Sequence, residues 1–530
     1  MSNQLQIIDL VIILCYLAAM LLAGFHFSRK NKSADRFTRA SGRIPGWAVG
    51  MSIFATFLSS NTFLGVPGKT FGSNWNVFVF SLSMPLAAWV AVKYFIPFYR
   101  NSGEISAYTH FENRFGPWAR TYAVVCFLLT QLARMGSIFF GIALTLQALT
   151  GFDMKTIMMV TGACIIVYTV LGGIEAVIWT EVAQAVIKTF GALLILYLVV
   201  VNMPGGVKQI MQIGNDHQKF SLGSFHPDFT QPTFWVILLY GFFINLNNFG
   251  VDQNYVQRYH TAASPAQAKR SVWICVAMYL PASLIFCIIG SSLFAYYQAH
   301  PGLIDVVKHQ VAVERAGVGA SSATVAQIAG ALKPGDYGDK IMPYFMVTKI
   351  PVGLIGLIVS AVLSAAMSTI SSGMNASSTV FSLDIYKRYF KPSINEKQKL
   401  RILHLATVVF GLGGMLAGVA MIGIKSVLDI WWMLSGIFAS GMLGLFLLGI
   451  ISKQTGNAAA MAATFIGIAV VLWMTLPSLI PDQYQNLRNG LDVNMTIVVG
   501  TLSIFLAGIL LTRFKTTPNY KNDLLTTEKS

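Results

Sequence analysis

The sequence has 530 residues, of which 55% are hydrophobic and 11% are charged, and its mean hydropathy is +0.62. A soluble domain carries about 25% charged residues, so this composition excludes a soluble globular protein. The apolar runs are continuous and about 20 residues long, which is the length of a membrane-spanning helix. The net charge of +16 comes from basic residues in short segments beside these runs, which argues against nucleic-acid binding. We predict an all-α polytopic membrane protein.

The apolar runs follow one another along the whole chain. Thirteen runs are predicted to cross the membrane: 7–27, 46–66, 76–99, 119–149, 155–172, 174–202, 232–255, 272–297, 343–385, 402–423, 426–452, 457–477 and 493–513. The run at 343–385 exceeds the about 20 residues of one straight crossing, so we expect it to tilt or to extend beyond the bilayer.

The basic residues predict the orientation in the membrane. With the N-terminus outside, the cytoplasmic segments hold the basic clusters: Arg29, Lys30, Lys32, Arg36, Arg39 and Arg43, then Arg100, Arg114 and Arg120, then Arg258, Lys269 and Arg270, then Lys387, Arg388, Lys391, Lys397, Lys399 and Arg401. The short outer connections hold single residues: Lys69, Lys155, Lys425 and Arg488. Cytoplasmic loops are enriched in lysine and arginine. We therefore expect a multi-pass protein of the plasma membrane, a bacterial inner membrane, with its C-terminus in the cytoplasm.

Two outer loops, 204–231 and 299–342, are long, and neither resembles an enzyme domain. The sequence has no P-loop, no GxSxG and no HExxH motif. ATP-driven transport and membrane-embedded hydrolysis therefore lack their usual parts. We predict that the protein is not an enzyme.

Polar residues interrupt two of the apolar runs near their middle. Ser59, Ser60, Asn61 and Thr62 interrupt the second run, and the seventh run contains a group of five: Asn245, Asn247, Asn248, Gly250 and Asp252. Unwound backbone inside a membrane is tolerated where it lines a cavity or is buried by protein. Broken helices in corresponding positions of two halves indicate a secondary transporter with inverted repeats. The alternative is two ordinary polar kinks.

The ninth run is rich in hydroxyls, with Ser368, Thr369, Ser371 and Ser372 close together. Hydroxyl and carbonyl oxygens suit Na⁺, so the cluster indicates an ion site inside a bundle. The alternative is close helix packing, in which the hydroxyls bond back to their own helix.

Two charged residues lie deep in apolar runs, where a charge faces a partner or a cavity. Arg134 offers a planar fork for a carboxylate, so it binds an anionic substrate or pairs with an acid such as Asp252. Glu181 is an ion ligand, a proton site or half of a structural pair, and Lys188 follows it on the same face.

These features together resemble the sodium:solute symporter family, which includes the sodium–glucose cotransporters. YTVLGGIEAVIWTEVAQ at 168–184 is similar to that family's signature, as are the second run, VQRY at 256–259 and SLDIYKR at 382–388. The resemblance implies a leucine-transporter-type fold with two inverted five-helix repeats. The implied parts are an extra helix and cytoplasmic loop (1–45), the first repeat (46–203), an extracellular loop (204–231), the second repeat (232–453), two C-terminal helices (454–513) and a cytoplasmic tail (514–530).

The resemblance also implies the binding residues. The main sodium site would use the backbone carbonyls of Ala55, Leu58 and Ala365 and the hydroxyls of Ser368 and Thr369. A second sodium would be held by Ser368, Ser371, Ser372 and Glu181, where the family pattern has Asp in place of Glu. The substrate would contact Ser59, Ser60, Thr62 and Arg134.

Within the family, the sialic acid transporters look most similar, through the FATFLSS, FLG and PGK segments of the second run. We expect a monomeric symporter that imports a small organic solute with Na⁺, such as the carboxylated sugar sialic acid. The alternatives are a neutral sugar such as glucose or galactose, or another monocarboxylate. A membrane sensor or a channel on a transporter core is the hypothesis from a different class.

Overall fold

The structure is a computed structural model, and it describes residues 6–28, 33–317, 320–424, 426–479 and 489–514. Arg29, Lys30, Lys32, Lys425, Arg488 and residues 515–530 of the expected tail lie outside the described residues. Within the described ranges the named elements are all helices.

The helices divide as follows along the chain. The first part comprises α1 Ile7–Ser28, α2 Ala34–Arg39, η1 Ala40–Gly42, α3 Gly46–Phe57, α4 Ser60–Gly72, α5 Asn76–Leu82, α6 Met84–Val90, η2 Ala91–Phe95, α7 Ile96–Ser102, α8 Thr109–Phe115, α9 Pro117–Thr150, α10 Met154–Val201 and α11 Gly206–Asp216. The second part comprises α12 Phe234–Gly250, α13 Gln253–Thr261, α14 Pro265–Ala299, α15 Pro301–Ala316, α16 Ser322–Ala331, α17 Pro334–Lys349, α18 Leu354–Val380, η3 Phe381–Phe390, α19 Glu396–Ala420, α20 Val427–Ile451, α21 Asn457–Leu479 and α22 Met495–Phe514.

Among the described residues, 10 helical stretches are long and apolar enough to cross a membrane, and two bent helix pairs raise the number to 12. One of the stretches, α10, has 48 residues, and at about 1.5 Å per residue it is more than twice as long as the about 30 Å of a bilayer core. Gly173 breaks it, with φ 58° and ψ −168°, a conformation open to glycine. Counting α10 as two crossings, one on each side of Gly173, would raise the number to the 13 that the sequence predicts.

The two interrupted runs are bent helix pairs. α3 and α4 meet at 53°, and α12 and α13 meet at 46°. The breaks fall at Leu58–Ser59 and at Val251–Asp252. Ser60 begins α4 and Asn245 lies within α12, so most of the interrupting polar residues are helical and flank the breaks.

The region around 343–385 differs from the expectation of one long tilted helix. α17 ends at Lys349 and α18 begins at Leu354, because Pro351 and Gly353, which has φ 87°, interrupt the helix between them. α17 packs against α4 instead. The expected outer loop 299–342 is also largely helical, as α15, α16 and the start of α17.

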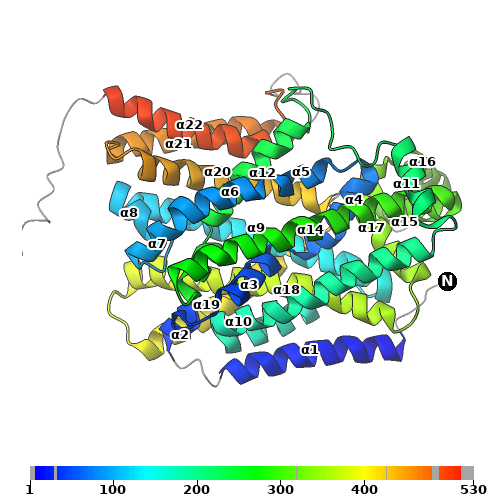
Figure 1. Cartoon of the computed structure of the whole chain (residues 1–530), viewed down its shortest axis with the longest axis horizontal. Helices are drawn as coiled ribbons and strands as arrows, with labels where there is room; N and C mark the ends of the chain where they lie inside the picture. The colour runs from blue at the N-terminus through cyan, green and yellow to red at the C-terminus, as the bar shows by residue number, and fades with distance from the viewer. Residues whose placement is uncertain (1–5, 29–32, 318–319, 425, 480–488, 515–530) are drawn as a thin grey trace, which may run out of the picture.

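The helices run roughly side by side, with α1 at one edge near α10 and α21 and α22 at the opposite edge near α20 (Figure 1). α11, α15 and α16 gather at one end of the bundle, and α2, α7 and α8 lie at the other (Figure 1). Segments that the sequence predicts on the same side of the membrane thus share an end of the bundle.

α10 and α18 pack closely at the centre of the bundle. Gly191 of α10 faces Ala361 of α18, and a Cβ at Gly191 would lie 2.3 Å from the Ala361 Cβ. Real carbon atoms do not approach so closely, so this position requires glycine. The contact brings the charged half of α10 against the serine-rich α18.

Candidate ion and substrate sites

The end of α3 faces the hydroxyls of α18. α3 ends at Phe57, so its last carbonyls lack helical partners and carry the negative end of the helix dipole. Ser368 Oγ lies within hydrogen-bond distance of two carbonyls, Ala55 O and Ala365 O, at 3.0 Å each. Thr369 Oγ1 lies 3.3 Å from Ala365 O. The structure therefore brings these predicted main-site residues together.

The side chain of Lys188, from the second half of α10, reaches the same group of atoms. Its Nζ donates to Ala55 O at 2.7 Å, to Leu58 O at 2.9 Å and to Ser368 Oγ at 2.9 Å. Lys188 is fully buried. Three of the predicted sodium ligands, Ala55, Leu58 and Ser368, thus accept hydrogen bonds from a lysine side chain. The sequence did not predict this contact.

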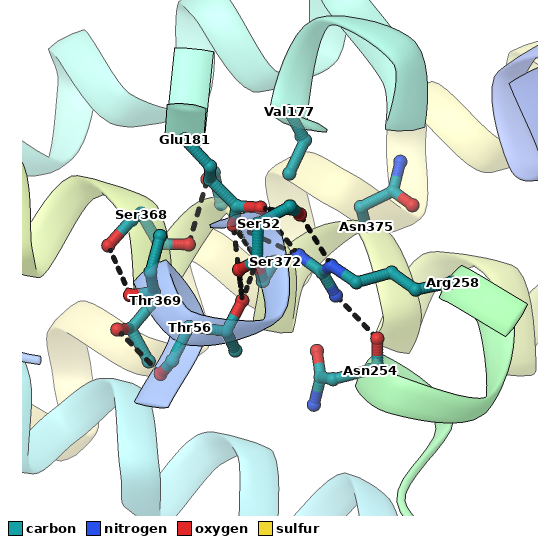
Figure 2. A network of polar contacts seen from close by, with 12 residues as sticks. Ser52, Thr56, Val177, Glu181, Asn254, Arg258, Ser368, Thr369, Ser372 and Asn375 are labelled. Atoms are coloured by element: carbon teal, nitrogen blue, oxygen red, sulfur yellow. Dashed lines mark hydrogen bonds and ion pairs between the residues drawn. The ribbon is translucent and has the colours of Figure 1, made fainter. Parts of the chain in front are cut away.

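Glu181 is paired with Arg258 of α13. Arg258 Nη2 lies 3.0 Å from Glu181 Oε1 and 2.8 Å from Oε2, and both side chains are buried, with 1% and 0% exposure. Figure 2 shows the guanidinium reaching across to Glu181 from its own helix. Lys188, which follows Glu181 on α10, donates to the end of α3 instead.

Three hydroxyls complete the surroundings of Glu181. Ser52 Oγ and Ser372 Oγ donate to its carboxylate, and Thr56 Oγ1 lies 3.3 Å from Oε1. Arg258 also donates through Nε to Ser52 Oγ at 2.8 Å and through Nη2 to Ser372 Oγ at 2.6 Å. The carboxylate is thus surrounded by donors from three helices (Figure 2).

The predicted second sodium site is only partly assembled. Ser372 contacts Glu181 as expected, but Ser371 does not join them. Its Oγ donates to Ser368 O at 3.2 Å, along its own helix. Ser371 therefore takes the packing alternative, because a hydroxyl in a buried helix can bond to a preceding carbonyl.

A cavity of about 70 Å³ lies beside the break between α3 and α4. Its wall includes three of the four predicted substrate residues, Ser59, Thr62 and Arg134. The other lining residues are polar or aromatic for the most part: Asn61, Ser81, Asn248, Ser283, Phe57, Phe80, Tyr255, Tyr279, Trp431 and Trp432, with Val66, Val77, Ile244 and Leu428. Hydroxyls, amides and aromatic faces around one cation suit a polar organic ligand.

Arg134 is buried in this wall. Its Nη2 donates to Thr56 O at 2.9 Å and to the Tyr255 hydroxyl at 3.3 Å. Its Nη1 lies 4.0 Å from Asp252 Oδ2, and its Cζ lies 5.7 Å from the centre of the Trp431 ring. At 4.0 Å the contact with Asp252 is a loose ion pair. Arg134 can therefore serve either alternative that the sequence offers, as the partner of Asp252 or as the binding group for a substrate carboxylate.

Ser60 does not line the cavity. Its Oγ lies 3.4 Å from Ile138 O of α9, because the first turn of α4 rotates it away. Asn61 lines the cavity instead. Its Nδ2 donates to Ser137 Oγ at 2.8 Å, and its Oδ1 is a buried acceptor without a partner.

Arg258 lies inside the bundle and not in the cytoplasmic segment that the sequence predicts for it. Its side chain is 1% exposed. Its neighbour Asp252 caps α13, accepting from the backbone N of Asn254 at 2.8 Å. α13 therefore continues the broken span inward rather than forming a loop.

Residues 37–467 match the model of the sodium:solute symporter family. The chain belongs to this family, whose coupling ion is Na⁺. Two similar proteins of known function are both transporters. It is 33% identical over 510 residues to the sodium/sialic acid symporter SiaT of Proteus mirabilis (strain HI4320), covering 95% of this chain and 94% of that protein. It is 32% identical over 526 residues to the sodium/sialic acid symporter NanT of Aliivibrio fischeri (strain ATCC 700601 / ES114), covering 98% and 94%.

The fold agrees with these relatives. The chain superimposes with a TM-score of 0.83 on a sodium-coupled sialic acid symporter in a substrate-bound outward-open state, at 30% identity, covering 96% of this chain and 98% of that one. The predicted leucine-transporter-type fold is confirmed. The protein is a multi-pass protein of the inner membrane, as its apolar helices and bacterial relatives indicate.

Proposed function

We propose that this protein imports sialic acid together with Na⁺ by alternating access. The observation that carries the proposal is the guanidinium of Arg134 in a cavity of hydroxyls, amides and aromatic rings. Its support comes from relatives at 32% and 33% identity that are named as sodium/sialic acid symporters.

Each part of a sialic acid has a chemical counterpart in the cavity. Its carboxylate matches the fork of Arg134, which would exchange the loose contact with Asp252 for a charge-assisted pair. Its hydroxyl and amide groups match Ser59, Thr62 and Asn61, which line the cavity. A neutral sugar such as glucose would leave Arg134 without an anionic ligand, which favours the carboxylated substrate.

Transport requires the cavity to change its size. Its volume of about 70 Å³ holds a few water molecules but not a whole sugar. The two helix breaks give α4 and α13 freedom to move relative to α3 and α12, so they are the natural places for opening.

We propose that the main sodium site consists of Ala55, Leu58, Ala365, Ser368 and Thr369. A second sodium at Glu181, Ser371 and Ser372 would require Arg258 to release the carboxylate. We therefore propose one sodium per cycle.

One sodium ion is enough to accumulate the substrate. Each Na⁺ supplies about 3.7 kcal/mol at about 100 mV and a tenfold gradient, and the inward movement of a monoanion costs about 2.3 kcal/mol. The remaining about 1.4 kcal/mol sustains about a tenfold solute gradient.

We also propose the organisation that the resemblance implies. The inverted repeats would be 46–203 and 232–453, each beginning with a bent helix pair, and 454–513 would add two helices. The N-terminus would be outside and the C-terminus in the cytoplasm, since α11, α15 and α16 share the end opposite to α2 and α8 (Figure 1). We propose that the protein functions as a monomer.

The test combines binding and uptake. Purified protein is heated with sialic acid, glucose or a simple monocarboxylate, in NaCl or choline chloride, and uptake is measured in proteoliposomes. We expect stabilisation and uptake with sialic acid in NaCl. Ser368→Ala and Thr369→Ala should raise the sodium concentration for half-maximal uptake. Stabilisation by glucose alone would refute the substrate proposal.

A further inference from the structure

We propose that Lys188 is a tethered cation that competes with Na⁺ for the main site, so that its ammonium and a sodium ion are alternative occupants of one set of ligands. The inference rests on the proposed function, because it concerns the ion site of that symporter. It goes beyond that function by proposing that Lys188 sets the apparent sodium affinity of the main site.

The ammonium is fully matched by its surroundings. A lysine carries three N–H donors, and Nζ has three acceptors at 2.7, 2.9 and 2.9 Å, which are Ala55 O, Leu58 O and Ser368 Oγ. Two of them are carbonyls at the end of α3, where the helix dipole favours a cation. The lysine therefore supplies the positive charge for these three oxygens that a bound sodium ion would supply.

An ion and the ammonium cannot share this place. A cation that binds Ala55 O, Leu58 O and Ser368 Oγ at once needs the same three oxygens that accept from Nζ. It would therefore lie close to Nζ, and two like charges at such a distance repel strongly in a buried environment. Sodium can bind all three ligands only after the ammonium has withdrawn.

The surrounding charges explain why Lys188 turns to these oxygens. Glu181, on the same helix, has both carboxylate oxygens engaged by Arg258. Asp252 faces Arg134, at 4.0 Å, and accepts from the backbone and side-chain nitrogens of Asn254. Two phenols bond to the same two helices: Tyr16 accepts from Gln184 of α10, and Tyr168 donates to Met367 O of α18. The carboxylates of the site are thus already engaged.

Lys219 provides a matched control. It is a second buried lysine, and its Nζ donates to Phe71 O and Ser73 O at 2.8 Å each, at the end of α4. Its acceptors are not predicted ion ligands. Replacing it removes a buried lysine that caps helix carbonyls without touching the main site.

The experiment compares the wild-type protein with Lys188→Met and Lys219→Met. Thermal unfolding is followed over a titration of NaCl against choline chloride at constant ionic strength, and sialic acid uptake is followed over the same titration. A competitor that is seated about nine-tenths of the time raises an apparent dissociation constant about tenfold. We expect the sodium concentration at the midpoint of both titrations to be at least about tenfold lower for Lys188→Met than for the wild type. For Lys219→Met we expect the same midpoint as for the wild type.

An unchanged sodium midpoint in Lys188→Met would overturn the inference. If that variant does not fold, Lys188→Gln, which keeps a donor but loses the charge, serves the same comparison. A second test, a structure of the wild-type protein in saturating NaCl, does not depend on whether a variant folds. An ion bound to Ser368 Oγ with Nζ still at hydrogen-bond distance would also overturn the inference.

The sialic acid arm separates the two proposals. If sialic acid neither stabilises nor enters with any of the three proteins while the sodium midpoint shifts as expected, the substrate proposal fails and the role of Lys188 stands. If sialic acid uptake is sodium-dependent with the same midpoint in Lys188→Met as in the wild type, the role of Lys188 fails and the proposed function stands.

Discussion

One guanidinium nitrogen of Arg258 bridges both carboxylate oxygens of Glu181, at 3.0 and 2.8 Å, in a fully buried position. The carboxylate that could have neutralised an ion therefore already has a cation of the protein beside it. This pair leads to two predictions, one on stability and one on stoichiometry.

Glu181→Gln should destabilise the protein strongly. The amide preserves the size of the side chain but leaves Arg258 without its counter-charge, and breaking a buried ion pair costs about 3–5 kcal/mol. Thermal unfolding in detergent measures the effect. Glu175→Gln is the control on the same helix. Glu175 pairs with the partly exposed Arg36 at 3.1 Å, so its loss should cost less than about 1 kcal/mol. A stable Glu181→Gln protein with weakened sodium dependence would instead identify Glu181 as an ion ligand.

The flux ratio in proteoliposomes should be one Na⁺ per sialic acid. A second ion at Glu181 would have to displace Arg258, which also donates to Ser52 and Ser372. One Na⁺ with one monoanion carries no net charge, so an imposed potassium diffusion potential should leave the uptake unchanged. A ratio of two, with uptake driven by negative inside potential, would mean that Arg258 releases Glu181 during the cycle.

Arg134→Lys should lower kcat/KM for sialic acid uptake by at least about tenfold, and Arg134→Ala should nearly abolish uptake. A lysine cannot reproduce the planar fork, and a hydrogen bond to a charged group contributes about 1.5–3 kcal/mol. Arg315→Lys is the control, because Arg315 pairs with Asp336 at 2.9 Å and neither residue lines the cavity. Normal uptake by Arg134→Ala would show that the substrate carboxylate is bound elsewhere.

Asp339 of α17 should make stability depend on pH. Its Oδ2 accepts from the backbone N of Val427 at 2.9 Å, and burial raises the pKa of its carboxyl to about 6. An unfolded aspartate has a pKa of about 3.9, so the folded state binds the proton more tightly. The contribution of Asp339 to stability is therefore largest below about pH 4 and falls by about 3 kcal/mol as pH rises to about 6.

Asp339→Asn tests this sign, because the amide can still accept from Val427 but does not ionise. Unfolding temperatures of the two proteins are compared from pH 4 to pH 7. The variant should gain stability relative to the wild type up to about pH 6, and then keep a constant difference. Parallel curves over the whole range would contradict the raised pKa.

The fold was predictable because its signals are local. Long apolar runs predicted the spans, and the polar groups near Ser59 and Asn245 predicted the two broken helices. The split between α17 and α18 was missed, because Pro351 and Gly353 lie in an otherwise apolar run. Ser60 was assigned to the wrong surface, because a break placed one or two residues away changes which hydroxyls of a helical turn face the cavity.

The partners of the buried charges could not be derived from the sequence. Lys188 and Ala55 are 133 residues apart in the chain, and sequence alone gives no distance between them. The sequence feature that pointed to Lys188 was its place inside an apolar run, because a charged residue at such a position is usually functional. Arg258 gave a weaker signal, because it follows an apolar run where cytoplasmic arginines are common.

The contact between Gly191 and Ala361 has a mechanical consequence. With no space for even one methyl group between them, α10 and α18 have little freedom to rotate or slide past each other, so Lys188 and Ser368 travel on one rigid body. The carbonyls of Ala55 and Leu58 belong to a different body, the end of α3. A cation held at the proposed main site would therefore be released when the two bodies separate, because two of its five ligands, the carbonyls of Ala55 and Leu58, leave at once.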